Sequence, residues 1–233
     1  MGSLAGKAAL VTGGSRGIGA AVAEKLTALG ARVAVMYQNT KPDNGFAIRA
    51  DSADPDAVVA AVEETAVHFG RLDVLVNNAG VFWVGPLDEL GRDEFDHTMA
   101  VNVRAPFLAA RAAAKHMRGG GRIISIGSNV AVHAPFPGFA LYSASKTALI
   151  GMTKGLARDL GPSGITVNVV NPGPTDTDMN PADGPMSDAI RGLTALGRYG
   201  TPSEIAEVVA ALAGEAGAYV TGSSINADGG FTV

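Results

Sequence analysis

Three residues have the types and spacing needed for proton transfer. Tyr142 and Lys146 stand four apart in the segment YSASK, and Ser128 lies fourteen residues upstream of the tyrosine. On a helix, residues four apart share a face, with about 5–6 Å between their Cβ atoms. A free tyrosine has a pKa of about 10, and a neighbouring cation favours its phenolate form. We therefore expect Lys146 to lower the pKa of Tyr142, so that the phenol can exchange a proton with a substrate. An ordinary helix face that happens to carry this pair is the alternative.

A glycine-rich segment near the N-terminus indicates a nucleotide site. The apolar run Lys7–Thr12 is followed by GGSRGIG at residues 13–19 and by the helix-forming segment Ala20–Leu29. Strand, glycine turn and helix form the context of a dinucleotide site, in which the helix N-terminus binds the pyrophosphate. The G-x-x-x-G-x-G spacing differs from the general fingerprint, and a tight turn before an ordinary helix remains an alternative.

The end of the second strand indicates which dinucleotide is bound. The strand Arg32–Tyr37 is followed by Gln38, and the first acidic residue after it is Asp43. An acid near this strand end binds the ribose 2′-hydroxyl of NAD, and its absence leaves room for a 2′-phosphate. The guanidinium of Arg16 can hold a phosphate as a charged fork. We therefore predict NADP(H) in preference to NAD(H).

Length and composition limit the kind of protein. The 233 residues include no cysteine, are 47% hydrophobic, and carry a net charge of −4. This length fits one large α/β domain over residues 1–233, and the charge argues against nucleic-acid binding. We find no signal peptide and no uninterrupted apolar run of about 18 residues, so we expect a cytoplasmic protein that does not enter a membrane.

Alternating strand and helix patterns predict a parallel sheet with crossover helices. Further strands are expected at residues 46–50, 72–76, 122–126, 165–170 and 223–227, and helices at 55–69, 93–117 with a kink at Pro106, 141–160 and 203–213. Ligands of such sheets bind beyond the carboxyl ends of the strands. Four residues each follow a predicted strand and are therefore expected to lie together at this edge: Gly13, Asn78, Ser128 and Gly173. Residues 177–196 have weak periodicity, and we interpret them as a substrate lid or a plain surface loop.

The combined motifs resemble those of the short-chain dehydrogenase/reductase family. They are TGGSRGIG at 12–19, NNAG at 77–80, Asn102, Ser128, Tyr142-x-x-x-Lys146 and Pro172-Gly173, in the family's order and along the whole chain. The resemblance, which includes bacterial 3-oxoacyl-carrier-protein-reductase-like members, implies a single Rossmann-like domain. It further implies a doubly wound sheet of seven parallel strands with helices on both faces, and an NAD(P)(H)-dependent oxidoreductase of a small-molecule carbonyl or alcohol. Homotetramers or homodimers built on the helices at 93–117 and 141–160 are implied as well.

The resemblance assigns roles to individual residues. It implies that Tyr142 exchanges the proton with the substrate oxygen, that Lys146 lowers the tyrosine pKa and binds the nicotinamide ribose, and that Ser128 polarises the substrate oxygen. Asn102 would hold a water that links Lys146 to solvent. The implied cofactor-binding residues are Gly13, Ser15, Arg16, Gly17, Ile18, Gly19, Tyr37, Gln38, Asp51, Ser52, Asn78, Ala79, Gly80, Tyr142, Lys146, Pro172, Gly173, Thr175 and Thr177.

The connection between the second and third strands departs from the family pattern. Only about fourteen residues separate Tyr37 from Asp51, so the usual helix near 38–46 must be truncated or absent, unless residues are missing. The segments at 51–54 and 180–186 resemble a bacterial subgroup with a cyclic-di-GMP-binding member. A nucleotide-binding regulator on the same fold with little turnover is therefore the alternative function, because fold alone does not determine function.

The substrate and other chemistries leave weaker signals. Several residues near the strand ends could line an apolar pocket for a hydrophobic or aromatic ketone, or pack between subunits: Phe82, Trp83, His133, Phe136 and Phe139. There is no G-x-S-x-G elbow, which argues against a hydrolase. We predict no metal site, because the four histidines lack ligand spacing and the Asp176/Asp178 pair falls in a cofactor loop.

Overall fold

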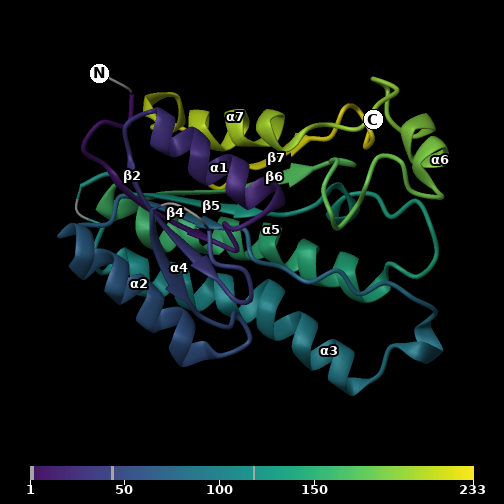
Figure 1. Cartoon of the computed structure of the whole chain (residues 1–233), viewed down its shortest axis with the longest axis horizontal. Coiled ribbons are helices and arrows are strands. Elements are labelled where there is room, and N and C mark those ends of the chain that lie inside the picture. The colour runs from purple at the N-terminus through teal and green to yellow at the C-terminus, as the bar shows by residue number, and fades with distance from the viewer. Residues whose placement is uncertain (1–2, 43–44, 118) are drawn as a thin grey trace.

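The structure is a computed structural model that describes residues 3–42, 45–117 and 119–233. Seven strands pair in parallel in the order β3-β2-β1-β4-β5-β6-β7 (Figure 1). They are β1 Ala8–Thr12, β2 Arg32–Tyr37, β3 Phe46–Arg49, β4 Val74–Asn77, β5 Arg122–Ile126, β6 Thr166–Pro172 and β7 Ser224–Ala227. The predicted fold class, a doubly wound parallel sheet in a single domain, is confirmed.

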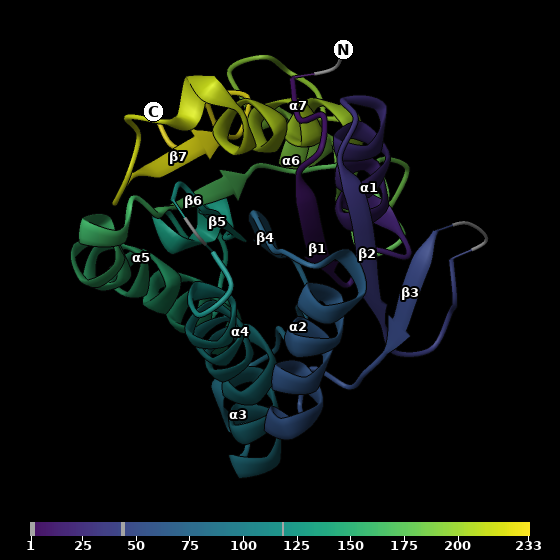
Figure 2. The same cartoon turned by 90° about the vertical axis from the view of Figure 1, so that its left-hand side faces the viewer.

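Helices cover both faces of the sheet (Figure 2). They are α1 Gly17–Ala28, α2 Pro55–Phe69, α3 Arg92–Met99, α4 Ala105–Ala114, α5 Ala140–Leu160, α6 Ser187–Gly192 and α7 Pro202–Ala213. The helices α1 and α7 lie on one face, and α2, α4 and α5 lie on the other. Because side chains of a strand alternate between faces, Leu10 of β1 packs into the core with α2 and α4, and Val11 packs into the core with α1 and α7.

The boundaries of the helices follow from local chemistry. The Asp54 side chain accepts hydrogen bonds from the first N–H groups of α2, Pro55 begins the helix, and Gly70 ends it in the left-handed conformation at φ 73°. At the start of α7, Thr201 and Glu204 form a capping box. The local sequence therefore determines where these helices begin.

One predicted helix is irregular in the structure. The segment predicted as a single helix over 93–117 consists of α3 and α4 joined by a π-helical segment, Ala100–Arg104. Pro106 has no N–H to donate to the carbonyl of Asn102, and the Ala105 N–H donates to Ala100, five residues back. The irregularity thus lies just before Pro106 rather than at it, and it includes Asn102.

Two connections differ from the sequence interpretation. The region 177–196 contains the short helix α6, which the weak periodicity did not reveal. Between β2 and β3, residues 38–42 and 45 form no helix, and Asp43 and Asn44 lie outside the described residues. Within the described part of the chain, every helix is too short or too polar to cross a membrane.

Candidate active site

A cavity of about 590 Å³ opens at the carboxyl ends of the central strands. In the sheet, β1 lies between β2 and β4, so the strand order reverses direction at β1. Doubly wound sheets bind ligands at such a switch point. All but two of the predicted site residues line this cavity: Gly13, Ser15, Arg16, Gly17, Ile18, Tyr37, Gln38, Asp51, Ser52, Asn78, Ala79, Gly80, Ser128, Tyr142, Lys146, Pro172, Gly173, Thr175 and Thr177. The two exceptions are Gly19 and Asn102.

The glycine loop brings the start of α1 to the cavity. Gly13 has φ 63°, a conformation that L side chains rarely adopt. A Cβ atom on Gly19 would lie 2.3 Å from the carbonyl oxygen of Gly13, so Gly19 allows close packing rather than ligand contact. The side chain of Arg16 does not cap α1, and the first turn holds no acid. The free N–H groups and the positive end of this helix therefore fit a pyrophosphate.

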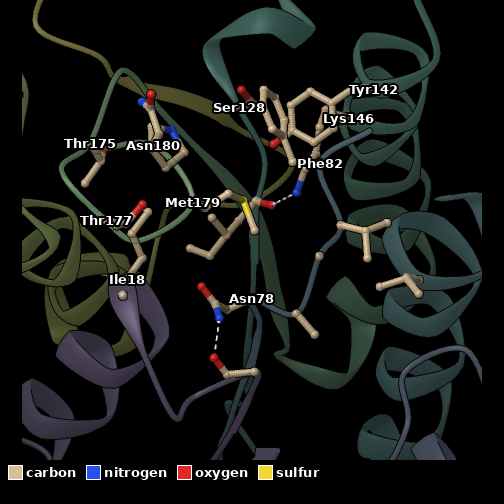
Figure 3. Close-up of a pocket in the computed structure, with 18 of the residues that line it drawn as sticks. Ile18, Asn78, Phe82, Ser128, Tyr142, Lys146, Thr175, Thr177, Met179 and Asn180 are labelled. Atoms are coloured by element: carbon tan, nitrogen blue, oxygen red, sulfur yellow. Dashed lines mark hydrogen bonds between the residues drawn. The ribbon is translucent and has the colours of Figure 1, made fainter. Parts of the chain in front are cut away.

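Thr12 and Asn78 fix the glycine loop to the neighbouring strand. The Thr12 hydroxyl accepts hydrogen bonds from the backbone N–H groups of Asn78 and Ala79, at 3.0 and 3.1 Å. The Asn78 side chain amide donates to the carbonyls of Thr12 and Gly13, at 3.0 and 2.9 Å. Asn78 is therefore a bridge between β1 and β4 as well as part of the cavity wall (Figure 3).

Lys146 lies deep in the wall of the cavity. Its side chain is almost fully buried, and its Nζ atom donates a hydrogen bond to the carbonyl oxygen of Ile126 at 2.9 Å. The same atom lies 5.7 Å from the centroid of the Tyr142 ring. Burial lowers the pKa of Lys146 to about 8, because the interior disfavours the charged amine.

The expectation that Lys146 brings the pKa of Tyr142 below its ordinary value of about 10 is wrong in this structure. Burial raises the pKa of Tyr142 to about 12, and a hydrogen bond with Ser128 lowers it by less than burial raises it. The Lys146 ammonium lies 5.7 Å from the ring centroid and bonds to the Ile126 carbonyl, and burial of the phenol outweighs its effect. Tyr142 is thus held in its protonated form over the whole neutral range.

Ser128 connects the end of β5 to the tyrosine. It is buried, donates a hydrogen bond to the side chain oxygen of Asn129 at 3.2 Å, and accepts one from the Val130 N–H at 3.4 Å. Ser128 also lowers the pKa of Tyr142, against the larger effect of burial. Figure 3 shows both side chains beside Phe82 at the same end of the cavity.

Asn102 lies behind the cavity rather than in its wall. Its amide nitrogen donates to the Val81 carbonyl and to the Ser145 hydroxyl, both at 3.0 Å, and its oxygen accepts from the Val81 N–H at 2.9 Å. A Cβ atom on Gly80 would lie 3.3 Å from this oxygen and 3.5 Å from Lys146 Nζ. Asn102, in the π-helical segment, thus supports the loop on which Gly80 and Val81 lie. Ser145, which the sequence analysis did not name, accepts the other hydrogen bond of the Asn102 amide.

The cavity also has a wall that the sequence analysis identified in part. Phe82, Phe136 and Phe139 line it, whereas Trp83 and His133 do not. Met179, Asn180 and Ile190 also line it, and they belong to the region 177–196 that was interpreted as a substrate lid or a surface loop. Phe231 was not anticipated, because no motif marks it and only folding brings the C-terminal segment to the site. Among the described residues, no group of three or more metal-ligating side chains is placed to hold an ion.

Comparison with known proteins places the chain among oxidoreductases. Residues 13–232 match a family described as enoyl-(acyl carrier protein) reductase. The chain is 46% identical over 239 residues to the cyclic-di-GMP-binding biofilm dispersal mediator protein of Escherichia coli K12, covering 99% of each. It is 40% identical over 253 residues to a versicolorin reductase of Emericella nidulans, covering 97% of this chain and 96% of that one. A short-chain dehydrogenase from Burkholderia cenocepacia J2315, solved with NADP, superimposes with a TM-score of 0.97 at 51% identity, covering 99% and 100% of the chains.

Proposed function

The chain belongs to the short-chain dehydrogenase/reductase family, and we propose that it uses NADPH to reduce a ketone or aldehyde, with Tyr142 as the proton donor. As a member of this family, it is an NAD(P)H-dependent oxidoreductase. One observation carries the proposal: Tyr142 and Ser128 lie at the same end of the cavity that begins at the glycine loop, and both line it (Figure 3). A carbonyl oxygen at this point would meet two hydroxyl donors together.

The protonation state of Tyr142 suits reduction. With a pKa of about 12, the phenol keeps its proton at neutral pH. Reduction of a carbonyl generates an alkoxide, which is a stronger base than a phenolate, so the proton moves downhill from Tyr142 to the substrate oxygen. Positioned proton transfer of this kind contributes about 10²–10⁴-fold to the rate. Oxidation of an alcohol would need the phenolate, which is rare below the pKa of the tyrosine.

Ser128 and Lys146 support this transfer in different ways. The Ser128 hydroxyl would hold the substrate oxygen beside the phenol, and such prearranged donors stabilise negative charge as it develops. The buried cation of Lys146 lies 5.7 Å from the Tyr142 ring and would stabilise the phenolate that remains after proton transfer. It would also bind the nicotinamide ribose.

The residues of the cavity fit NADP(H). The uncapped start of α1 would hold the pyrophosphate, and Arg16 would pair with the 2′-phosphate at the end of β2. Among the described residues that follow β2, 38–42 and 45, none is acidic, so nothing there repels a phosphate. When NADPH is bound, its nicotinamide supplies the hydride. The Burkholderia structure solved with NADP supports NADP binding.

We further propose that the protein works as a homodimer or homotetramer. Phe95 of α3 and Phe107 of α4 are about half exposed, and the outward residues of α5 include Ala144, Gly151 and Gly155, which permit close helix contact. Light scattering coupled to size exclusion would measure the mass, and a monomer at micromolar concentration would contradict this assembly.

The alternative function, a cyclic-di-GMP-type regulator with little turnover, is favoured by the name of the Escherichia coli relative. An assay of NADPH consumption with a panel of ketones and aldehydes distinguishes the two functions. The loss of NADPH absorbance measures the consumption. Consumption that needs both the carbonyl and Tyr142 supports the reductase. A protein that binds NADPH tightly, binds cyclic-di-GMP and reduces no carbonyl would support the regulator instead.

A further inference from the structure

The cavity continues past Tyr142 along three phenylalanine rings, Phe82, Phe136 and Phe139, here called the aromatic wall. The Phe82 ring meets the Tyr142 ring edge-on, with centroids 4.8 Å apart and an interplanar angle of 88°. Phe139 follows at 6.0 Å from Phe82, and Phe136 at 6.5 Å from Phe139. These separations are those of interacting aromatic rings, so the wall is continuous with the ring that bears the reactive hydroxyl.

A close backbone contact fixes the spacing of the aromatic wall. The Gly85 N–H donates a hydrogen bond to the Gly138 carbonyl at 3.1 Å, which joins the segment after Phe82 to the segment before Phe139. Gly138 has φ 90°, and a Cβ atom there would lie 3.2 Å from the Gly85 carbonyl oxygen. The rings therefore form a surface of defined shape, although they come from different loops.

The aromatic wall presents apolar surface to the cavity. Phe82 is 39% exposed, and Phe136 and Phe139 are partly exposed. Partly exposed rings beside a reactive hydroxyl lose contact with water when a flat apolar group covers them, and this burial favours binding.

The scarcity of lysine and arginine at this end of the cavity argues against an anionic ligand. Among the described residues that line the cavity, the only lysine and arginine are Lys146 and Arg16. Lys146 already bonds to the Ile126 carbonyl. Arg16 belongs to the glycine loop, and Ile18 of that loop lies at the opposite end of the cavity from Tyr142 and Phe82 (Figure 3). A carboxylate or phosphate against the aromatic wall would lose its hydration without gaining a free lysine or arginine as partner.

We propose that the substrate is an uncharged carbonyl compound with an aromatic group next to the carbonyl, and that this group lies against the aromatic wall. The proposal rests on the reductase function given above and specifies its substrate class. Phe82 is then a specificity-determining residue, because it contacts both the reactive tyrosine and the place of the aromatic group. Keto acids and carbonyls carried on a phosphate-bearing arm are poor substrates.

Four related α-keto compounds test the two parts of this proposal separately. Ethyl benzoylformate is aromatic and neutral, benzoylformate is aromatic and anionic, ethyl pyruvate is small and neutral, and pyruvate is small and anionic. With purified full-length protein and saturating NADPH, we expect kcat/KM for ethyl benzoylformate to exceed that of each of the others by about tenfold or more. An equal or higher kcat/KM for benzoylformate overturns the charge argument, and an equal or higher value for ethyl pyruvate overturns the aromatic one.

Variants of two neighbouring rings test the assignment to the wall. In Phe82→Ala, kcat/KM for ethyl benzoylformate should fall by about tenfold more than kcat/KM for ethyl pyruvate, and the difference in Phe82→Leu should lie between. Trp83→Ala is the matched control, because Trp83 is the next residue, is 46% exposed and does not line the cavity. Equal losses on both esters in Phe82→Ala, or the same selectivity change in Trp83→Ala, would contradict the role of Phe82.

The results of these assays distinguish a wrong substrate class from a wrong reductase function. If pyruvate or benzoylformate is reduced in a Tyr142-dependent way and the neutral aromatic ester is not, the reductase stands and the substrate class falls. If NADPH binds, as measured by its fluorescence, and neither these four compounds nor the wider carbonyl panel is reduced, both proposals fall.

Discussion

Asn102 and Val81 exchange two hydrogen bonds, one from the amide nitrogen to the Val81 carbonyl and one from the Val81 N–H to the amide oxygen. The Asn102 side chain is 1% exposed and also donates to the Ser145 hydroxyl of α5. The Ser145 hydroxyl in turn donates to the Tyr142 carbonyl at 2.7 Å. The Asn102 side chain thus connects the loop after β4 to α5, the helix that bears Tyr142.

We predict that Asn102→Ala lowers the free energy of unfolding by about 2–4 kcal/mol, because it leaves the Val81 N–H and carbonyl without partners inside the protein. Urea denaturation at neutral pH measures the loss. Asn39→Ala is the control, since Asn39 is exposed and its replacement should change stability by less than about 0.5 kcal/mol. Similar effects of the two substitutions would show that the Asn102 network does not stabilise the fold.

The phenol of Tyr142 is predicted to matter for turnover and not for cofactor binding. Tyr142→Phe keeps the ring and its contact with Phe82 and removes only the proton donor. Carbonyl reduction should fall by about 10²–10⁴-fold, while the Kd for NADPH, measured by fluorescence, stays within about twofold. Tyr219→Phe, at a fully exposed tyrosine, should change neither. Unchanged reduction by Tyr142→Phe would refute the assigned role.

The sequence predicts those features that depend on neighbouring residues. The strand before GGSRGIG, the caps of α2 at Asp54 and Gly70, and the strand ends that bring Asn78 and Ser128 together all follow from local patterns. The irregularity near Pro106 is predictable as well, because a proline removes one helical donor wherever it stands. That the chain responds with a π-helical segment around Asn102 depends on packing against Val81 and Ser145.

The error about the Tyr142 pKa has a physical reason. Helical spacing correctly brings Lys146 near the ring, but the pKa depends on burial and on hydrogen bonds that distant segments supply. The carbonyl of Ile126, on β5, attracts the ammonium, and burial of the phenol raises its pKa. In the same way, Phe231 reaches the cavity only because the C-terminal segment folds back, and no local pattern predicts that.

The pKa of Lys146 predicts the pH dependence of reduction. Its charge is present below about pH 8 and is lost above it, whereas Tyr142, with a pKa of about 12, stays protonated. Reduction should therefore be constant up to about pH 7 and decline as the pH rises through about 8, because the cation that stabilises the phenolate disappears. Measurement of kcat/KM between about pH 6 and 10, with circular dichroism to verify folding, tests this. A profile that is flat to about pH 10 would contradict it.

The same group is predicted to destabilise the fold at neutral pH. Its pKa is about 8 in the folded protein against an ordinary 10.5, so the unfolded chain binds more protons between these values and stability rises with pH across this window. The shift corresponds to about 3 kcal/mol, and the bond to Ile126 to about 1 kcal/mol. Lys146→Met should therefore be about 2 kcal/mol more stable at pH 7 and lose this advantage above about pH 10.5. Denaturation at both pH values measures this.

The exposed Lys154 of the same helix provides the control for that measurement. Lys154→Met should alter stability by less than about 0.5 kcal/mol at either pH, because an exposed amine is solvated in both states. If Lys146→Met were less stable than the unaltered protein at pH 7, burial of the charge would not be the dominant effect of this residue.

Arg16 is predicted to discriminate between the two nicotinamide cofactors. It is exposed at the start of α1 and lines the cavity beside the end of β2. In the proposed binding mode it would meet a 2′-phosphate, which NADPH has and NADH lacks. Arg16→Ala should raise KM for NADPH by about tenfold or more, since charge-assisted hydrogen bonds to phosphate are strong, and leave KM for NADH nearly unchanged. Arg16→Lys should lie between, because lysine keeps the charge without the planar fork. Steady-state kinetics of the unaltered protein and the two variants, with one carbonyl and both cofactors, measures the six KM values. An equal rise in KM for NADPH and NADH in Arg16→Ala would mean that Arg16 contacts the shared part of the dinucleotide instead.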